Sequence, residues 1–182
     1  MLVHNSIRQH AIRIPDESDL ECVHIRFNHT TPALNVIGLY LDVESRTKVD
    51  DLNKIFALLQ YKVDEIMSRG ESCIILGDWN RPELFTNKET YATKQLKEWI
   101  ENDEVDVKLL NDDTPTRINP TGGSSVLDLA VVSNNIENCV QKFTVDSDKK
   151  WTPFAIRKTN GLHTKQDQRS IDAVAVGCSG CI

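Results

Sequence analysis

An amphipathic helix between Lys48 and Arg69 is the feature that most constrains the fold of this chain. Apolar side chains recur there at intervals of three and four residues, at Val49, Leu52, Ile55, Phe56, Leu59, Val63, Ile66 and Met67. Gly70 follows as a helix stop signal. A helix of this length is only marginally stable alone in water, so we expect its apolar stripe to pack against a sheet.

Two strand-like runs precede this helix. Residues 21–27 alternate between apolar and polar side chains, and residues 34–40 form a second apolar run after the polar and proline-containing stretch between them. We expect the two runs to be antiparallel neighbours joined by a hairpin loop. His24 alternates with Val23 and Ile25, which predicts a surface position on the outer face of the strand.

The remaining elements define the fold class. We expect a helix over residues 89–102 and strands at residues 73–78, 107–110, 126–132, 139–145 and 170–176. This order predicts an α/β fold, a layered sandwich of mixed β-sheets flanked by helices rather than a purely parallel doubly wound sheet. With 182 residues, of which 40% are hydrophobic, the chain is expected to form one domain over residues 1–176, followed by a tail at residues 177–182.

Charge and cysteine content limit the partners and the compartment. The net charge of -6 argues against broad adhesion to nucleic acid, but residues 142–169 carry seven Lys or Arg against three Asp. No stretch reaches the roughly 20 apolar residues that a membrane helix needs. Cysteines within apolar runs are typical of reduced thiols, which predicts an intracellular protein, nuclear or cytoplasmic. Cys178 and Cys181 lack a second pair that would complete a zinc site, and we expect an inert tail there.

Polar residues stand at or within several of the predicted strands, where a fold alone does not need them. They are Tyr40, Asp78 with Asn80 after the buried run "CIIL", Asp128 between two leucines, and Asp167. A carboxylate within an apolar strand is costly unless hydrogen bonds, a cation or a metal receive it, although a buried Asp bonded only to backbone amides remains an alternative for Asp128. Strand alternation places Asp78 and Asn80 on one face.

These residues, in this order, resemble the endonuclease/exonuclease/phosphatase family, and specifically the endonuclease domain of non-LTR retrotransposon polyproteins. The resemblance is carried by "GLYLD" at residues 38–42, "GDWN" at residues 77–80, "TPTRINPTGGSSVLDLAVVS" at residues 114–133 and "TKQDQRSI" at residues 164–171. The ordered set covers nearly all of the chain and is more specific than any single motif.

The resemblance implies a phosphodiesterase that cleaves DNA with Mg²⁺ or Mn²⁺. In that reading Tyr40 holds the phosphate, Asp78 activates water and Asn80 stabilises the developing charge, while Asp128 and Asp167 support the general acid/base site. Asp167 is also the candidate metal ligand. The resemblance further points to Thr116 and Arg117 as contacts to DNA. Lys149, Lys150 and Arg157 of the basic stretch are additional candidates, and Trp79 is expected to pack beneath the site.

Two departures from the family pattern matter for activity. Gln168 stands where the family has a general acid/base histidine, and glutamine cannot exchange a proton near neutral pH. The chain also begins after the family's first two strands, so we expect a truncated fold without the principal metal-binding Glu. Both departures predict an impaired or inactive nuclease. A rescue by His163 is a minor alternative.

Three functions therefore stay open at this point. The first is a retroelement-derived DNA endonuclease, active or decayed. The second is a non-catalytic structural or interaction module on the same fold, and the third is a phosphatase of the same superfamily. The missing strands would leave sheet edges exposed, which predicts a protein partner or an oligomer that covers them.

Overall fold

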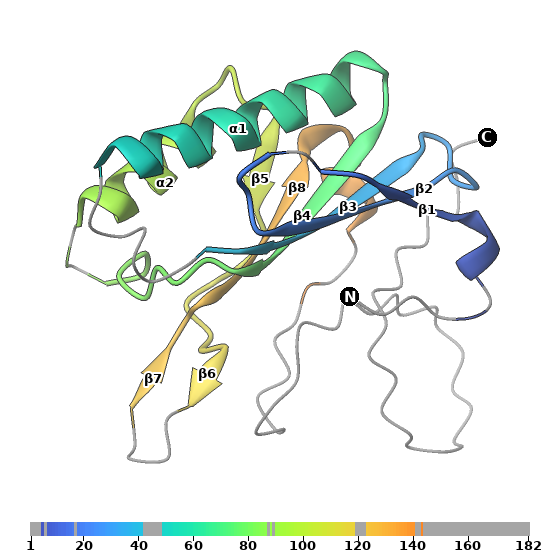
Figure 1. The fold of residues 1–182 in the computed structure, drawn as a ribbon. Coiled ribbons are helices and arrows are strands. Elements are labelled where there is room, and N and C mark those ends of the chain that lie inside the picture. The colour runs from blue at the N-terminus through green and yellow to red at the C-terminus, as the bar shows by residue number, and fades with distance from the viewer. Residues whose placement is uncertain are drawn as a thin grey trace, which may run out of the picture.

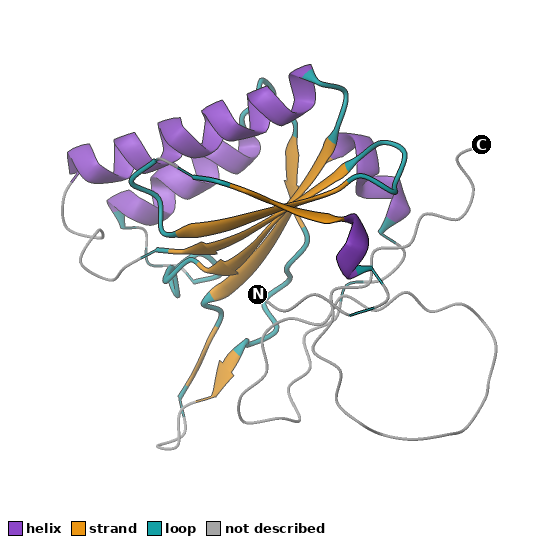
Figure 2. Ribbon diagram, turned by 45° about the vertical axis from the view of Figure 1, so that its right-hand side comes forward, coloured by secondary structure: helices purple, strands orange, loops and turns teal. Residues whose placement is uncertain are grey.

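A six-stranded mixed sheet with two helices on one face forms the centre of the molecule (Figures 1 and 2). The computed structural model describes residues 5, 7–16, 18–41, 49–86, 88, 90–118, 123–140 and 143. The strands are β1 (Ala11–Ile14), β2 (Cys22–Phe27), β3 (Leu34–Tyr40), β4 (Ser72–Asp78), β5 (Val107–Leu109) and β8 (Asp128–Ser133), in the spatial order β1-β2-β3-β4-β8-β5. A separate hairpin pairs β6 (Arg117–Ile118) with β7 (Ser124–Ser125).

The two α-helices agree closely with the sequence prediction. Helix α1 spans Val49–Ser68 and α2 spans Tyr91–Glu101. Gly70 has φ 67°, and the Glu71 amide donates to the Ile66 carbonyl, so the helix stop read from the sequence is confirmed. The hydroxyl oxygen of Thr90 accepts from the Thr93 amide and caps α2. None of the helices in the described residues is long and apolar enough to cross a membrane.

The sheet separates two apolar layers. Side chains from one face of the strands, including Ile37, Ile75 and Val131, pack with α1 and α2. Alternate positions, including Val36 and Ala130, face the opposite side and form a second buried cluster. Figure 2 shows both helices on the same side of the sheet. The mixed sheet flanked by helices is the fold class that the sequence predicted.

Strand pairing confirms the predicted antiparallel hairpin and shows a parallel pair that the sequence periodicity did not predict. β2 and β3 are antiparallel neighbours, as expected, whereas β3 and β4 pair in parallel because α1 connects them as a crossover. β1, the β6–β7 hairpin and the short 3-10 helix η1 (Arg8–His10) were not predicted. Residues 139–145 were predicted as a strand, but Cys139 ends the 3-10 helix η3 (Asn134–Cys139). The strand predicted at residues 170–176 and the tail lie outside the described residues.

His24 is buried, which corrects the surface position expected from alternation. It is 7% exposed, because its face of β2 is turned towards α1 rather than towards solvent. Its Nε2 lies 2.8 Å from Asn35 Oδ1, and burial lowers the pKa of the imidazole. Asn35 donates in turn to Glu71, whose carboxylate also receives Arg26. Arg26 holds the pKa of Glu71 at about 2, so this polar network joins β2, β3 and the start of β4 as an ion pair at neutral pH.

The described cysteines are reduced and differ in environment. Cys22, Cys73 and Cys139 form no disulfide. Cys73 is fully buried in the helix-side core, and burial raises its pKa to about 11. Cys22 is only partly buried, and its thiol donates to the Asp16 carboxylate at 2.5 Å.

Gly77 allows β3 and β4 to stay paired to their last residues. A Cβ added at Gly77 would lie 1.7 Å from the Leu39 carbonyl oxygen, which is part of the neighbouring backbone and cannot rotate away. The ladder continues past this point, with the Leu41 amide donating to the Asp78 carbonyl at 2.9 Å. Only glycine therefore lets the two strand ends lie side by side.

We predict that Gly77→Ala lowers the free energy of unfolding by about 3 kcal/mol, because the added methyl group forces β3 and β4 apart at their ends. Gly70→Ala is the matched control, since Gly70 also has a positive φ but a Cβ there meets no atom within 4 Å. The control should cost only about 1 kcal/mol. Urea unfolding of both variants tests this, and an equal loss for the two would contradict the steric account.

Candidate active site

Three polar side chains come together at the ends of adjacent strands. Tyr40 ends β3 and is in register with Asp78, the last residue of the parallel strand β4. Asp78 is in register with Asp128, the first residue of the antiparallel strand β8. By strand alternation, all three side chains lie on the face of the sheet that is turned away from α1 and α2. Val36 and Ala130 lie on the same face. The sheet therefore presents a phenol and two carboxylates in one row.

Asp78 and Asp128 form a closely spaced strand pair. The Trp79 amide donates to the Leu127 carbonyl at 2.9 Å, which brackets the two aspartates as a non-hydrogen-bonded antiparallel pair. In such pairs the Cα atoms are about 4.5 Å apart and the side chains are close neighbours. Burial raises the pKa of Asp128, and the negative charge of Asp78 adds to this rise. The two carboxylates thus repel each other in a partly buried setting.

Two polar side chains hold the start of β8 in place. The Thr116 hydroxyl accepts hydrogen bonds from the amides of Leu127 and Asp128 at 2.9 and 3.1 Å. Asn111 donates to the Asp128 carbonyl and accepts from the Ala130 amide. These side chains replace the ladder of a neighbouring strand beyond the end of β5. Asp128 is therefore at the start of a strand and not in the middle of one, as the apolar run had suggested.

Asn80 takes a different direction from the one that alternation predicted. It lies beyond the end of β4 with φ 49°, in the left-handed region, so the strand repeat no longer applies. Its backbone amide donates to Asp78 Oδ1 at 3.0 Å, and its side-chain nitrogen donates to the Leu41 carbonyl at 2.8 Å. Asn80 therefore connects the ends of β3 and β4. Trp79, between Asp78 and Asn80 in the sequence, is 0% exposed and lies in the helix-side core, as expected.

The β6–β7 hairpin extends away from the sheet beside this row (Figure 1). Arg117 is exposed on β6, in register with Ser125, and its charge opposes the rise in the pKa of Asp128. Thr116 was expected to contact DNA, but its hydroxyl oxygen accepts two backbone amides. Sequence reasoning gave no signal for the role of Asn111, because its contacts are made across the fold.

The other predicted site residues lie outside the described residues. These are Asp167, Gln168, Lys149, Lys150 and Arg157, together with His163. Tyr40, by contrast, is well placed for contact with a ligand, since its side chain is 45% exposed at the end of β3.

The row offers a partial fit to a divalent cation. Among the described residues no three His, Cys, Asp or Glu side chains are grouped closely enough to hold a metal ion. However, Mg²⁺ is commonly held by only one or two carboxylates, with water and substrate phosphate as the other ligands. Asp78 and Asp128 supply two carboxylates of this kind, and a cation between them would relieve their repulsion.

Comparison with known proteins identifies the family. The sequence matches the endonuclease-reverse transcriptase family over residues 34–151. A comparison with curated proteins gave no significant match. Among solved structures, the fold is similar to the endonuclease domain of TRAS1, a telomere-specific non-LTR retrotransposon. The TM-score is 0.58 and the identity 16%, over 78% of this chain and 62% of that domain.

Two further structures are similar at lower scores. Truncated TDP2 from Caenorhabditis elegans gives a TM-score of 0.39 with 15% identity, over 68% of this chain and 51% of that one. A β-hairpin deletion mutant of beta toxin from Staphylococcus aureus gives 0.43 with 19% identity, over 81% and 57% of the two chains. This chain thus spans less than two thirds of the length of each of these three structures. Because the family match covers more than half of the chain and includes the strands that carry Tyr40, Asp78 and Asp128, the chain belongs to the endonuclease-reverse transcriptase family.

Proposed function

We propose that this chain is a DNA phosphodiesterase module of the retroelement endonuclease type, in which hydrolysis is slowed by Gln168. The row of Tyr40, Asp78 and Asp128 on three adjacent strands carries this proposal. It joins a hydrogen-bond donor to two carboxylates at an exposed sheet end, the combination that phosphate binding and water activation require.

The cation would be held by Asp78 and Asp128. Hard oxygen ligands suit Mg²⁺ or Mn²⁺, and burial together with the charge of Asp78 raises the pKa of Asp128, so a cation here would favour its charged form. When bound, a divalent cation would neutralise phosphate charge that otherwise repels an attacking water. Asp167 remains a further candidate ligand from the sequence alone.

Tyr40, Asp78 and Asn80 have distinct tasks in this proposal. The exposed Tyr40 hydroxyl donates to a non-bridging phosphate oxygen, and Asp78 accepts a proton from the attacking water. Asn80 keeps the ends of β3 and β4 at a fixed separation through its bond to the Leu41 carbonyl. It acts as a positioning residue, in place of the direct contact with phosphate that the family resemblance implied.

DNA binding would involve two regions. Arg117 on the projecting hairpin supplies an exposed positive charge beside the row, and phosphate contacts of this kind position DNA without reading its sequence. Lys149, Lys150 and Arg157 belong to the basic stretch and would add to the electrostatic attraction. Thr116 supports the hairpin indirectly by holding the start of β8.

Gln168 limits the rate because its carboxamide cannot protonate the leaving oxygen. We predict that the chain nicks supercoiled plasmid slowly with Mg²⁺, and that Gln168→His raises the rate by about 10² or more. Gln166→His, two residues away, is the matched control and should have no effect. Adding Asp78→Asn to the Gln168→His variant should remove the gain.

Plasmid conversion measured over time with each variant decides the matter. Rapid nicking that does not respond to Gln168→His would contradict the assignment of Gln168. An absence of nicking in every variant, together with unchanged DNA binding, would favour the non-catalytic module instead.

Asp128 gives a second test that does not depend on turnover. The raised pKa means that the folded state binds the Asp128 proton more tightly than the unfolded state does. The resulting stabilisation of the fold is complete below the ordinary pKa of 3.8 and is lost as the pH rises through the higher folded-state pKa. Asp128→Asn should therefore raise the free energy of unfolding at pH 7, by about 0.5 to 1 kcal/mol. The same substitution should remove stabilisation by Mg²⁺.

Thermal unfolding at pH 7, with and without Mg²⁺, measures both effects. Asp113→Asn on an exposed loop is the control and should change neither. Lower stability of Asp128→Asn than of the unsubstituted protein at pH 7 would contradict the charge repulsion. Equal stabilisation of these two proteins by Mg²⁺ would show that the carboxylate pair is not a cation site.

A further inference from the structure

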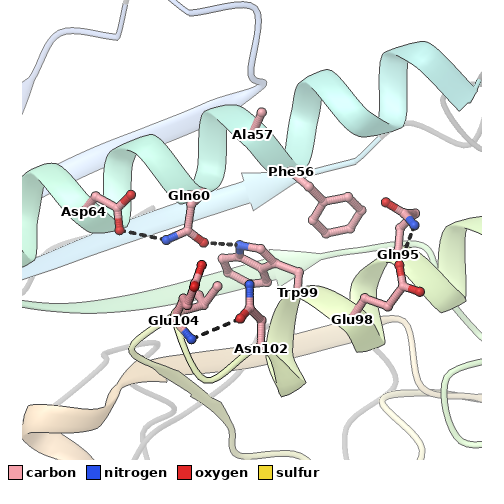
Figure 3. A pocket seen from close by; sticks show the side chains of 10 residues that line it. Phe56, Ala57, Gln60, Asp64, Gln95, Glu98, Trp99, Asn102 and Glu104 are labelled. Atoms are coloured by element: carbon pink, nitrogen blue, oxygen red, sulfur yellow. Dashed lines mark hydrogen bonds between the residues drawn. The ribbon is translucent and has the colours of Figure 1, made fainter.

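A pocket lies between α1 and α2, in the helical layer and thus across the sheet from the row of Tyr40, Asp78 and Asp128. Its volume is about 400 Å³. Figure 3 shows Phe56, Gln60 and Asp64 of α1 on one side, facing Trp99 and Glu98 of α2. The pocket is within the size range of about 300 to 1,000 Å³ that is usual for ligand sites. Nothing in the proposed phosphodiesterase function uses it.

Hydrogen bonds and ring packing fix the walls of the pocket. Gln60 accepts from the indole nitrogen of Trp99 at 2.9 Å and donates to Asp64 at 2.7 Å, so one side chain orients both an aromatic ring and a carboxylate. The Trp99 ring also packs against Phe56 and Trp79, with centroid separations of 6.0 and 6.1 Å. A site held in this way is formed before any ligand arrives.

The charged groups of the pocket all have the same sign. Its lining contains the carboxylates of Asp64, Glu98 and Glu104 and no Lys or Arg. Glu98 has an ion pair with Lys94 at 3.5 Å, but both side chains are more than half exposed, where such a pair contributes little. The pocket therefore combines an apolar floor with an excess of negative charge in its lining.

The acidic residues of the pocket do not stabilise α2. Residues 98–106 contain five acidic residues and no basic one, and they lie at the C-terminal end of α2 and just beyond it. The negative end of the helix dipole is located there, so carboxylates at this position oppose helix formation while Lys or Arg would favour it. A charge pattern that costs helix stability beside a formed pocket fits a cationic ligand.

We propose that this pocket binds an arginine side chain of a basic peptide segment in a protein partner. The apolar floor of Phe56 and Trp99 suits the methylene groups of arginine, and its planar guanidinium packs against aromatic rings. Asp64, Glu98 and Glu104 accept hydrogen bonds from the guanidinium nitrogens, which pair with carboxylates in a fixed geometry. The pocket volume leaves room for the peptide segment that carries the side chain.

Fluorescence anisotropy with a labelled peptide of alternating Arg and Gly tests the proposal on the full chain. The control peptide carries citrulline, which has the shape of arginine without its charge, and should bind about tenfold more weakly or worse. The variant Asp64→Asn/Glu98→Gln/Glu104→Gln should lose about tenfold or more in affinity for the arginine peptide.

The matched protein control removes the same number of charges elsewhere. Glu21→Gln/Asp50→Asn/Asp113→Asn changes three exposed carboxylates outside the pocket lining and should leave the affinity within about twofold, because distant exposed charges are screened at physiological salt. Ala57→Leu, a substitution on the pocket wall that changes no charge, gives a second approach and should also weaken binding.

Three results would overturn the proposal. One is equal weakening by the pocket variant and the control variant, which would indicate general charge attraction only. Another is equal binding of the citrulline and arginine peptides, which would indicate an apolar groove. The last is no binding of the arginine peptide at physiological salt. Nicking of DNA is not part of this readout, so its outcome is separate from that of the proposed phosphodiesterase function.

Discussion

The parallel pairing of β3 and β4 is the constraint on which the candidate site depends. These strands bring together two segments separated by the whole of α1, and the pairing persists to Tyr40 and Asp78 because Gly77 presents no Cβ to the Leu39 carbonyl. With any other residue at Gly77 the backbones could not approach so closely, and the phenol would separate from the carboxylate. The glycine of "GDWN" therefore has a steric task that is distinct from the chemistry of the aspartate beside it.

The two faces of the sheet have different properties as a result. One face is covered by α1 and α2 and holds the largest apolar cluster, while the other carries the polar row at its end. Trp79 connects the two, since it lies between Asp78 and Asn80 in sequence but packs against Trp99 in the helical layer. The same short segment thus supports the candidate active site on one face and contacts the wall of the proposed arginine pocket on the other.

Local patterns predicted much of this arrangement. The apolar stripe of α1, the glycine stop after it and the hairpin of β2 and β3 were all correct, because each depends on residues close in sequence. The parallel register of β3 and β4 and the burial of His24 were not predicted, since they are set by packing between distant segments. The turn at Asn80 was not predicted either. The alternation argument assumed that the strand continues to Asn80, whereas β4 ends two residues earlier, at Asp78.

The chemical residues were easier to find than their supports. Tyr40 and Asp78 end apolar runs and Asp128 interrupts one, so their types and positions were visible in the sequence. Thr116 and Asn111 were not recognised as supports of β8, because a single hydroxyl or amide in a loop does not indicate which backbone groups it bonds. The acidic pocket was missed for a similar reason, as its lining comes from two helices that periodicity treats separately.

The most direct measurement is disulfide formation between β4 and β8. In a non-hydrogen-bonded antiparallel pair the Cα atoms are close enough for a disulfide, so the double variant Asp78→Cys/Asp128→Cys should form one rapidly on mild oxidation, mapped by mass spectrometry of peptides. Asp78→Cys/Ser125→Cys, with its second cysteine three positions earlier, should not. The register of the site would be contradicted by the absence of the first disulfide, or by preferential formation of the second.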